Sequence, residues 1–289
     1  MSGAPTRTPT AAADRDAPHL GSPRVHLRRT RSTNDRAREL ALAGAPSGTL
    51  VTAGEQTAGR GRQGRRWLAP ANSALLMSLL LRWAAPERTP PLLPLIAAVA
   101  VCDAADASSS KGEQAQIKWP NDVVIAASPA GKGGDAPRGA DAGGRGSLAK
   151  LAGILVEGRP QQGWAVIGVG LNVAVRLQEL EPELRAAAVA QGGEPTAGLP
   201  AATLGLPQSA IEPTLARLLA ALEQRLGEPA HATLGAWRSR DALLGREIAW
   251  ASGRGRAEGI DGAGRLVVAL DGGGRTTLDA GEVHLRTPA

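Results

Sequence analysis

The chain contains no Phe and no Tyr in 289 residues, and its six Trp are its only aromatic side chains. Aromatic rings fill much of an ordinary protein core, so this chain must build its interior from aliphatic side chains. The complete absence of two residue types indicates that Leu, Val, Ile or Trp stand in for them, as in the run from Leu75 to Leu81. At 43% hydrophobic content the chain can still bury a core, and its length suits one large domain plus a small one.

Hydrophobic patterning divides the chain into three parts. Residues 1–22 are Ala, Pro, Thr and Arg without periodicity and predict a disordered tail. Strands are expected at 50–53, 75–83, 151–157 and 164–173, and helices at 35–43, 91–107, 213–226 and on through Trp237. Residues 126–147 lack a hydrophobic pattern and predict a flexible insertion between two strands. From Gly245 onward, short strands at 247–251, 266–270 and 283–285 alternate with Gly-rich turns, which predicts a small β-barrel.

The overall charge narrows the function only in part. The formal charge is +6 and the sequence pI is about 10.5, which suits nucleic acid, membrane headgroups or small anionic substrates such as ATP. A single cysteine, Cys102, excludes an internal disulfide and favours a reducing cytoplasm. No apolar run approaches about 18 residues and no secretory signal is visible, so we expect a soluble, cytoplasmic protein without a membrane partner. The four histidines show no metal-ligand spacing, and no nucleophile triad is visible, so neither a structural zinc site nor covalent enzyme catalysis is expected.

Two short motifs point to chemistry. In residues 59–67, Gly-Arg-Gly-Arg-Gln-Gly-Arg-Arg-Trp, glycines alternate with arginines, so the segment has little intrinsic order and many anion-pairing guanidiniums. On its own this run fits a loop that orders around an anion and, equally well, a solvated basic loop or a nucleic-acid patch. The second motif, Lys118-Trp119-Pro120-Asn121-Asp122, breaks a strand at a proline and then offers an amide and a carboxylate together. Polar groups at such a strand end often contact ligands.

These motifs, with three others, resemble the bacterial biotin protein ligases. The five matching segments follow the family's order: Ser32-Thr33-Asn34, residues 55–67, residues 118–122, Lys150 to Glu157, and Ile167 to Val173. The resemblance implies an α+β fold in which a mixed β-sheet with flanking helices, residues 23–240, is followed by a small SH3-like β-barrel, residues 241–289. It also implies an enzyme that uses biotin, ATP and Mg²⁺ to form biotinyl-5′-adenylate and then biotinylates a biotin carboxyl carrier protein of acetyl-CoA carboxylase.

The resemblance also assigns roles to residues. Lys150, Arg60 and Arg62 are the expected catalytic residues. The expected biotin contacts are Ser32, Thr33, Asn34, Gln56, Arg60, Gly61, Arg62, Lys150 and Gly153. The expected ATP and adenylate contacts are Arg62, Arg65, Lys118, Asn121, Asp122 and Asn172, with Asp122 as a Mg²⁺ ligand. Gly168 and Gly170 are expected to let the backbone approach the ligand.

Several of these residues also have ordinary structural interpretations. Ser32 or Thr33 could simply cap the following helix, and Asn121 could cap a turn rather than bind substrate. Lys150 could be a strand-flanking lysine, and Trp119 is expected to belong to the core. Arg66 has no assigned role.

Two alternative functions stay open. A lipoate ligase would have the same fold, although the arginine-glycine loop and residues 118–122 favour biotin. A basic nucleic-acid-binding protein or repressor would need a recognition helix or aromatic platforms, and the sequence offers neither. Because the Ser-Thr-Asn motif begins at residue 32, we expect no N-terminal winged-helix domain and no specific DNA binding. A homodimer is neither predicted nor excluded.

Overall fold

The computed structural model describes residues 20–83, 92–109, 112, 114–127, 146–190, 199–279 and 283–285. Most of the predicted tail, residues 1–19, and most of the predicted insertion, residues 128–145, lie outside these ranges. At the end of the predicted tail, Leu20 packs against the core and the Gly21 N–H donates to the Gly48 carbonyl (2.9 Å). The described part of the chain holds no helix long and apolar enough to cross a bilayer.

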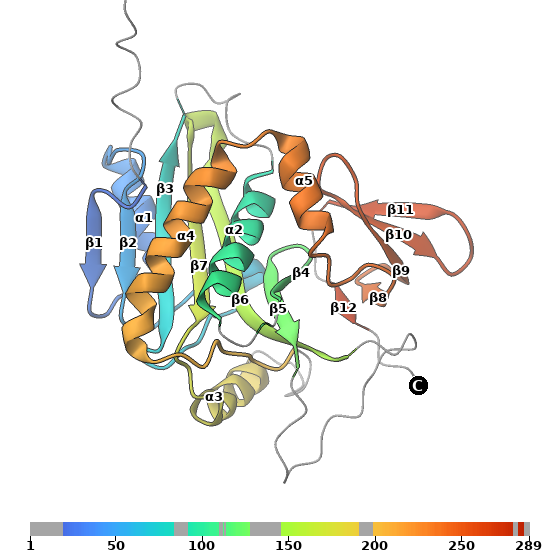
Figure 1. Ribbon diagram of the computed structural model, residues 1–289, viewed down its shortest axis with the longest axis horizontal. Helices are drawn as coiled ribbons and strands as arrows, with labels where there is room; N and C mark the ends of the chain where they lie inside the picture. The colour runs from blue at the N-terminus through green and yellow to red at the C-terminus, as the bar shows by residue number, and fades with distance from the viewer. Residues whose placement is uncertain are drawn as a thin grey trace, which may run out of the picture.

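Within the described residues, seven strands form one mixed sheet in the order β1-β2-β3-β7-β6-β5-β4 (Figure 1). Only β1 and β2 pair in parallel; the other neighbours are antiparallel. The strands are β1 (Arg24–Leu27), β2 (Leu50–Ala53), β3 (Ala74–Arg82), β4 (Gln116–Lys118), β5 (Asp122–Ala126), β6 (Leu148–Arg159) and β7 (Trp164–Asn172). The predicted mixed sheet is therefore confirmed.

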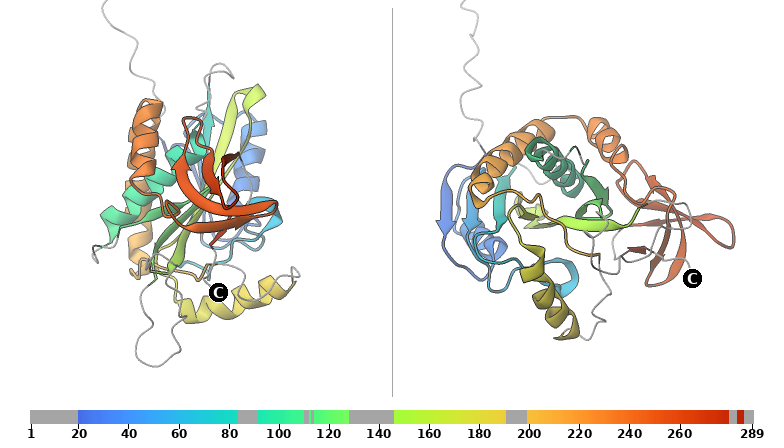
Figure 2. Two further views of the ribbon diagram at one scale, coloured as in Figure 1. Left: turned by 90° about the vertical axis from the view of Figure 1, so that its right-hand side faces the viewer. Right: turned by 60° about the horizontal axis from the view of Figure 1, so that its bottom comes forward.

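Helices cover both faces of this sheet (Figures 1 and 2). On one face lie α2 (Leu93–Ser108) and α4 (Ile211–Leu226), and on the other lies α1 (Thr33–Leu42). Strand β3 shows how an aliphatic sequence serves both faces. Leu79 belongs to the large core beneath α2 and α4, whereas its neighbour Leu80 belongs to the smaller cluster beneath α1. Successive side chains of a strand point to opposite faces, so a continuous run of Leu suits a strand that is buried on both.

The C-terminal part forms a second, antiparallel sheet in the order β11-β10-β9-β8-β12. Its strands are β8 (Glu247–Trp250), β9 (Gly253–Ile260), β10 (Leu266–Leu270), β11 (Arg275–Leu278) and β12 (His284–Leu285). The predicted second β unit is thus present. Among the described residues its order is linear, with β11 and β12 at the two edges, and no strand pairing that would close it into a barrel is present there.

Backbone hydrogen bonds join the edge strand β4 to the segment that leads into the second sheet. The Ile117 N–H donates to the Arg240 carbonyl (2.7 Å), and the Ala242 N–H donates to the Ile117 carbonyl (2.9 Å). The indole of Trp119, only 2% exposed, donates to the Gly264 carbonyl (3.1 Å). The expectation that Trp119 is a core residue is confirmed, and its ring holds the two units together.

Some predicted boundaries differ from the structure. Helix α1 begins at Thr33, two residues early, and β6 begins at Leu148, which places Lys150 inside the strand rather than before it. Helix α3 (Leu177–Ala190) is not among the predicted elements; it contains Pro182, a residue that usually ends helices. Helix α5 (Ala230–Arg238) matches the segment predicted through Trp237.

Candidate active site

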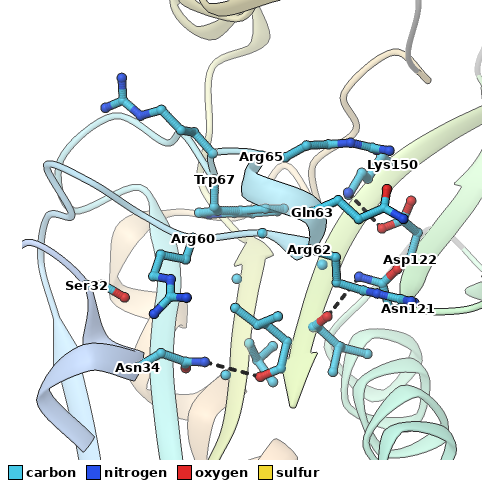
Figure 3. Close-up of a pocket in the computed structure, with 18 of the residues that line it drawn as sticks. Ser32, Asn34, Arg60, Arg62, Gln63, Arg65, Trp67, Asn121, Asp122 and Lys150 are labelled. Atoms are coloured by element: carbon cyan, nitrogen blue, oxygen red, sulfur yellow. Dashed lines mark hydrogen bonds and ion pairs between the residues drawn. The ribbon is translucent and has the colours of Figure 1, made fainter. Parts of the chain in front are cut away.

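A cavity of about 100 Å³ opens where the start of α1, the loop before β3, the β4–β5 turn and strands β6 and β7 come together (Figure 3). The predicted site residues that line it are Ser32, Thr33, Asn34, Gln56, Arg60, Gly61, Arg62, Arg65, Lys118, Asn121, Asp122, Lys150 and Gly153. They come from positions up to about 120 residues apart, so the fold is what makes them one site.

The start of α1 supplies uncharged hydrogen-bonding groups to the cavity. Ser32 occupies the N-cap position, as the capping interpretation expects, and its carbonyl accepts from the Arg36 N–H (3.2 Å), but its side chain makes no capping bond. The Thr33 N–H instead donates to Gln56 Oε1 (2.7 Å), and Thr33 Oγ1 lies 3.1 Å from the same oxygen. The Gln56 carbonyl is thereby fixed, which turns its amide nitrogen away from α1.

Asn34 is held from two sides. Ser78 Oγ donates to Asn34 Oδ1 (2.6 Å), and Asn34 Nδ2 donates to Glu157 Oε2 (2.9 Å). A Cβ on Gly168 would lie 2.0 Å from Asn34 Oδ1. The Asn34 side chain therefore requires glycine at position 168, which also lines the cavity.

The arginine-glycine loop is a compact hairpin. The Gly61 N–H donates to the Arg65 carbonyl (2.7 Å) and the Trp67 N–H donates to the Gly59 carbonyl (3.0 Å). A Cβ on Gly59 would lie 2.5 Å from the Trp67 carbonyl oxygen, so this close pairing requires glycine. The tip turns through Gln63, whose φ of 54° is left-handed.

The loop arginines divide into two groups. Arg60 points toward Asn34, at the end of the cavity that Ser32 lines, whereas Arg62 and Arg65 lie on the side of Asp122 and Lys150 (Figure 3). A hydrogen bond to Asp35 raises the pKa of Arg60. Burial lowers the pKa of Arg62, a trend that the charge of Arg65 reinforces and that of Asp122 opposes.

The far end of the cavity is strongly cationic. Lys118 is only 7% exposed, and burial, aided by the positive charges of Lys150 and Arg65, lowers its pKa. Lys150 Nζ lies 2.7 Å from Asp122 Oδ1. Lys118, Lys150, Arg62 and Arg65 thus surround one carboxylate, and this excess of positive charge favours an anion.

Trp67 is a cavity residue to which the sequence assigned no role. The Lys150 Nζ lies 5.8 Å from the centroid of its ring, within the range of a cation–π contact. A Cβ on Gly170 would lie 2.4 Å from the indole, and one on Gly153 would lie 3.1 Å from it. Gly170 therefore makes room for Trp67, and its predicted approach to the ligand stays a prediction. The position of Trp67 at the end of the arginine-glycine motif was the signal that could have identified it.

Two predicted asparagine contacts are used by the protein itself. Asn121 lines the cavity, but its Nδ2 donates to the Ile154 carbonyl (2.8 Å). Asn172 is not among the lining residues; it is 3% exposed, and its Nδ2 donates to the Ala202 carbonyl (2.8 Å). The structure brings together the other predicted residues and leaves Asn172 behind the wall of the cavity.

Sequence comparisons agree with this architecture. The Biotin/lipoate A/B protein ligase family matches residues 26–173, and the Biotin protein ligase C terminal domain matches residues 243–286. The biotin–acetyl-CoA-carboxylase ligase of Paracoccus denitrificans is 32% identical over 270 residues, which cover 89% of this chain and 98% of that protein. The enzyme of the same name from Mycobacterium tuberculosis is 33% identical, with 89% and 87% covered.

The match to a longer relative is partial. The bifunctional ligase/repressor BirA of Bacillus spizizenii is 38% identical over 157 residues, which span 53% of this chain and 41% of that protein. Among solved structures, a biotin protein ligase from Aquifex aeolicus in complex with biotin and ATP superposes with a TM-score of 0.65 at 22% identity, covering 92% of this chain and all of that one. At this identity the superposition supports the fold.

Proposed function

The chain belongs to the Biotin/lipoate A/B protein ligase family, and on that basis we propose that it is a biotin protein ligase. It activates biotin with ATP to biotinyl-5′-adenylate and pyrophosphate, and it then transfers biotin to a lysine of a biotin carboxyl carrier protein of acetyl-CoA carboxylase. The names of the relatives from Paracoccus and Mycobacterium support both the substrate and the carrier.

The observation that carries this proposal is the unequal character of the two ends of the cavity. One end presents the neutral hydrogen-bonding groups of Ser32, Thr33 and Gln56, and the other presents Lys150 and, close enough to it to shift its pKa, Lys118. Biotin has a neutral ureido ring at one end and a carboxylate at the other. The ring suits the first end, which leaves the carboxylate among the cations.

The first reaction brings two anions together. A carboxylate oxygen of biotin attacks the α-phosphorus of ATP, a new P–O bond forms, and the bond to the leaving pyrophosphate breaks. Lys150, Arg62 and Arg65 stabilise the negative charge on the transferred phosphoryl group and on the leaving group, since preformed cationic donors act where charge develops. Burial of Lys118 and Arg62 strengthens this interaction, because less water screens it.

The Asp122 carboxylate is the group in the cavity that could hold Mg²⁺. Asp122 is the carboxylate among the lining residues, and Mg²⁺ commonly binds one or two carboxylates together with substrate phosphates. The Asp122 carboxylate would hold the ion while Lys150, which it now contacts at 2.7 Å, turns toward the substrate anions. Bound there, the ion would neutralise phosphate charge.

The second reaction needs the adenylate to survive until the carrier arrives. The neutral amine of the carrier lysine attacks the acyl carbon and a C–N bond forms. The bond from the acyl carbon to the phosphate oxygen breaks, AMP leaves, and the nitrogen loses a proton to solvent. The arginine-glycine loop, which lines one side of the cavity, excludes water from the acyl phosphate in the meantime.

A labelling assay tests the proposed function. Incubation with biotin, ATP and a biotin carboxyl carrier domain should biotinylate one carrier lysine, and omission of ATP should abolish the product. Radiolabelled biotin and lipoate, supplied separately, should separate the two acids, with an adenylate formed from biotin. Formation of lipoyl-adenylate alone would refute the choice of biotin, to which the names of the relatives point.

A further inference from the structure

The guanidinium of Arg60 is shared by two carboxylates from different parts of the fold. Its Nη1 donates to Asp35 Oδ1 (2.7 Å), and its Nη2 lies 3.0 Å from Glu157 Oε1. The Arg60 and Asp35 side chains are 40% and 39% exposed, and that of Glu157 is 21% exposed. Each carboxylate occupies one terminal nitrogen of the guanidinium, so Arg60 is directed toward protein anions rather than toward the cationic end of the cavity.

Both partners stand on regular elements. Asp35 lies in the first turn of α1, and Glu157 lies in β6, where it pairs with Val166 of β7. Arg60 lies on the ascending arm of the hairpin, where it bridges to Arg66. The contacts of Arg60 with Asp35 and Glu157 therefore attach the glycine-rich loop, which has little intrinsic order, to helix α1 and strand β6.

Glu157 also reaches the uncharged end of the cavity. Its Oε1 faces Arg60 while its Oε2 accepts a hydrogen bond from Asn34 Nδ2 (2.9 Å). Asn34 in turn accepts from Ser78. A single carboxylate thus connects the loop to a side chain that lines the cavity.

We propose that Glu157, together with Asp35, is a positioning residue that holds the arginine-glycine loop closed through Arg60. Glu157 couples closure to the orientation of Asn34 because the two contacts use opposite oxygens of one carboxylate. Arg60 acts as the anchor of the loop and points away from the side of the cavity on which Arg62 and Arg65 lie. This assignment rests on the proposed function only in that the closed loop retains the adenylate.

Limited trypsin digestion tests the anchor without biotin or ATP. Glu157→Gln keeps the size of the side chain but offers one oxygen, so it can satisfy Asn34 or Arg60 but not both. Cleavage after Arg62, Arg65 and Arg66, followed by mass spectrometry, should be about fivefold faster than in the wild type, as expected for the loss of one partly exposed ion pair. Glu179→Gln, which removes a carboxylate paired with Arg176 on α3, is the matched control and should not change the rate.

A double-mutant cycle separates the anchor from a general loosening of the fold. In an Arg60→Ala background, Glu157→Gln should add nothing further at the same three sites. An equal acceleration in both backgrounds, or wild-type cleavage of Glu157→Gln, would overturn the proposal. If Glu157→Gln does not fold, Asp35→Asn takes its place, because Asp35 lies at the surface and contacts the other terminal nitrogen of Arg60.

Adenylate retention gives the functional readout. At saturating biotin and ATP, Glu157→Gln should still release pyrophosphate but lose biotinyl-adenylate to solution faster, detected as labelling of bystander lysines. Unchanged retention would overturn the link between the anchor and the intermediate. Failure of the wild type to release pyrophosphate would instead refute the proposed function. The digestion would still test the loop anchor, because it uses neither biotin nor ATP.

Discussion

The Lys150 ammonium lies between a carboxylate and an aromatic ring, with Asp122 at 2.7 Å and the Trp67 centroid at 5.8 Å. If it neutralises the reacting anions, Lys150→Ala should reduce adenylate formation by at least about 100-fold, the usual cost of one such donor. Biotin should still bind, more weakly, through Ser32, Thr33 and Gln56. Pyrophosphate release and isothermal titration with biotin measure the two effects separately, and wild-type adenylation by the variant would refute the assignment.

Alanine substitutions at two glycines, Gly168 and Gly235, should change the stability of the fold in opposite directions. A Cβ on Gly168 would meet Asn34 Oδ1 at 2.0 Å, so Gly168→Ala should displace Asn34, destabilise the fold by about 1–3 kcal/mol and raise the KM for biotin. Gly235, inside α5, has nothing within 4 Å of an added Cβ. Gly235→Ala should therefore stabilise the protein by about 0.5–1 kcal/mol with no change in activity. Thermal unfolding of both variants measures the two changes in stability, and a shift in the same direction for both would contradict these predictions.

Asp241 predicts a pH dependence of stability. Burial raises its pKa from 3.8 to about 6, and its Oδ2 takes no hydrogen bond from the described residues. Between pH 4 and 6 the folded protein holds this proton more tightly than the unfolded chain does. The free energy of unfolding should therefore fall as pH rises through this window, by at most about 3 kcal/mol.

Asp241→Asn tests that dependence. Asparagine keeps the oxygen that accepts from the Leu243 N–H (2.8 Å) and cannot ionise. The variant should unfold at higher denaturant concentration than the wild type at pH 7 and show no such gain at pH 4. Parallel stability curves from pH 4 to 7 would contradict the burial of a charged carboxylate at this position.

Strands and helices could be predicted where the pattern of apolar residues within the segment itself determines the element. Runs such as Leu50–Ala53 and Trp164–Asn172 are buried along their whole length, and their apolar character predicts this. A strand before Pro120 was recognised from its motif, but its hydrogen bonds to residues 240 and 242, which are distant in sequence, could not be read from the local pattern. In the site, the cations were found from their motifs. The carboxylates that bind Arg60 were not, since Asp35 lies 25 residues away and Glu157 lies on another strand.

The β5–β6 hairpin predicts that the segment between its strands is dispensable. Ala126 pairs with Leu148, and the Ala127 N–H donates to the Ser147 carbonyl (2.8 Å), so the chain ends at 127 and 147 are already adjacent. Replacing residues 128–145 with a short Gly-Ser turn should change stability by no more than about 1–2 kcal/mol, since each halving of a loop is worth only about 0.6 kcal/mol. Denaturant unfolding measures this. Ligation should survive, and a large loss would indicate a carrier contact in the segment.

Considered as one body, the molecule carries a formal charge of +6. This predicts weak, sequence-independent binding to duplex DNA through phosphate contacts, with affinity that falls steeply as salt rises. Fluorescence anisotropy with two unrelated duplexes should give equal affinities at every salt concentration. A protected operator site at physiological salt would contradict the prediction.

A core without Phe and Tyr also has an optical consequence. All six Trp fall within the described residues, and of these only Trp67 lines the cavity. Near-ultraviolet absorption and intrinsic emission therefore come from indole alone, with no tyrosine to transfer excitation energy to it. A ligand that binds in the cavity changes the surroundings of Trp67 and should therefore change its emission. The other five indoles lie elsewhere and give a constant background, so Trp67 serves as an intrinsic fluorescent reporter of ligand binding.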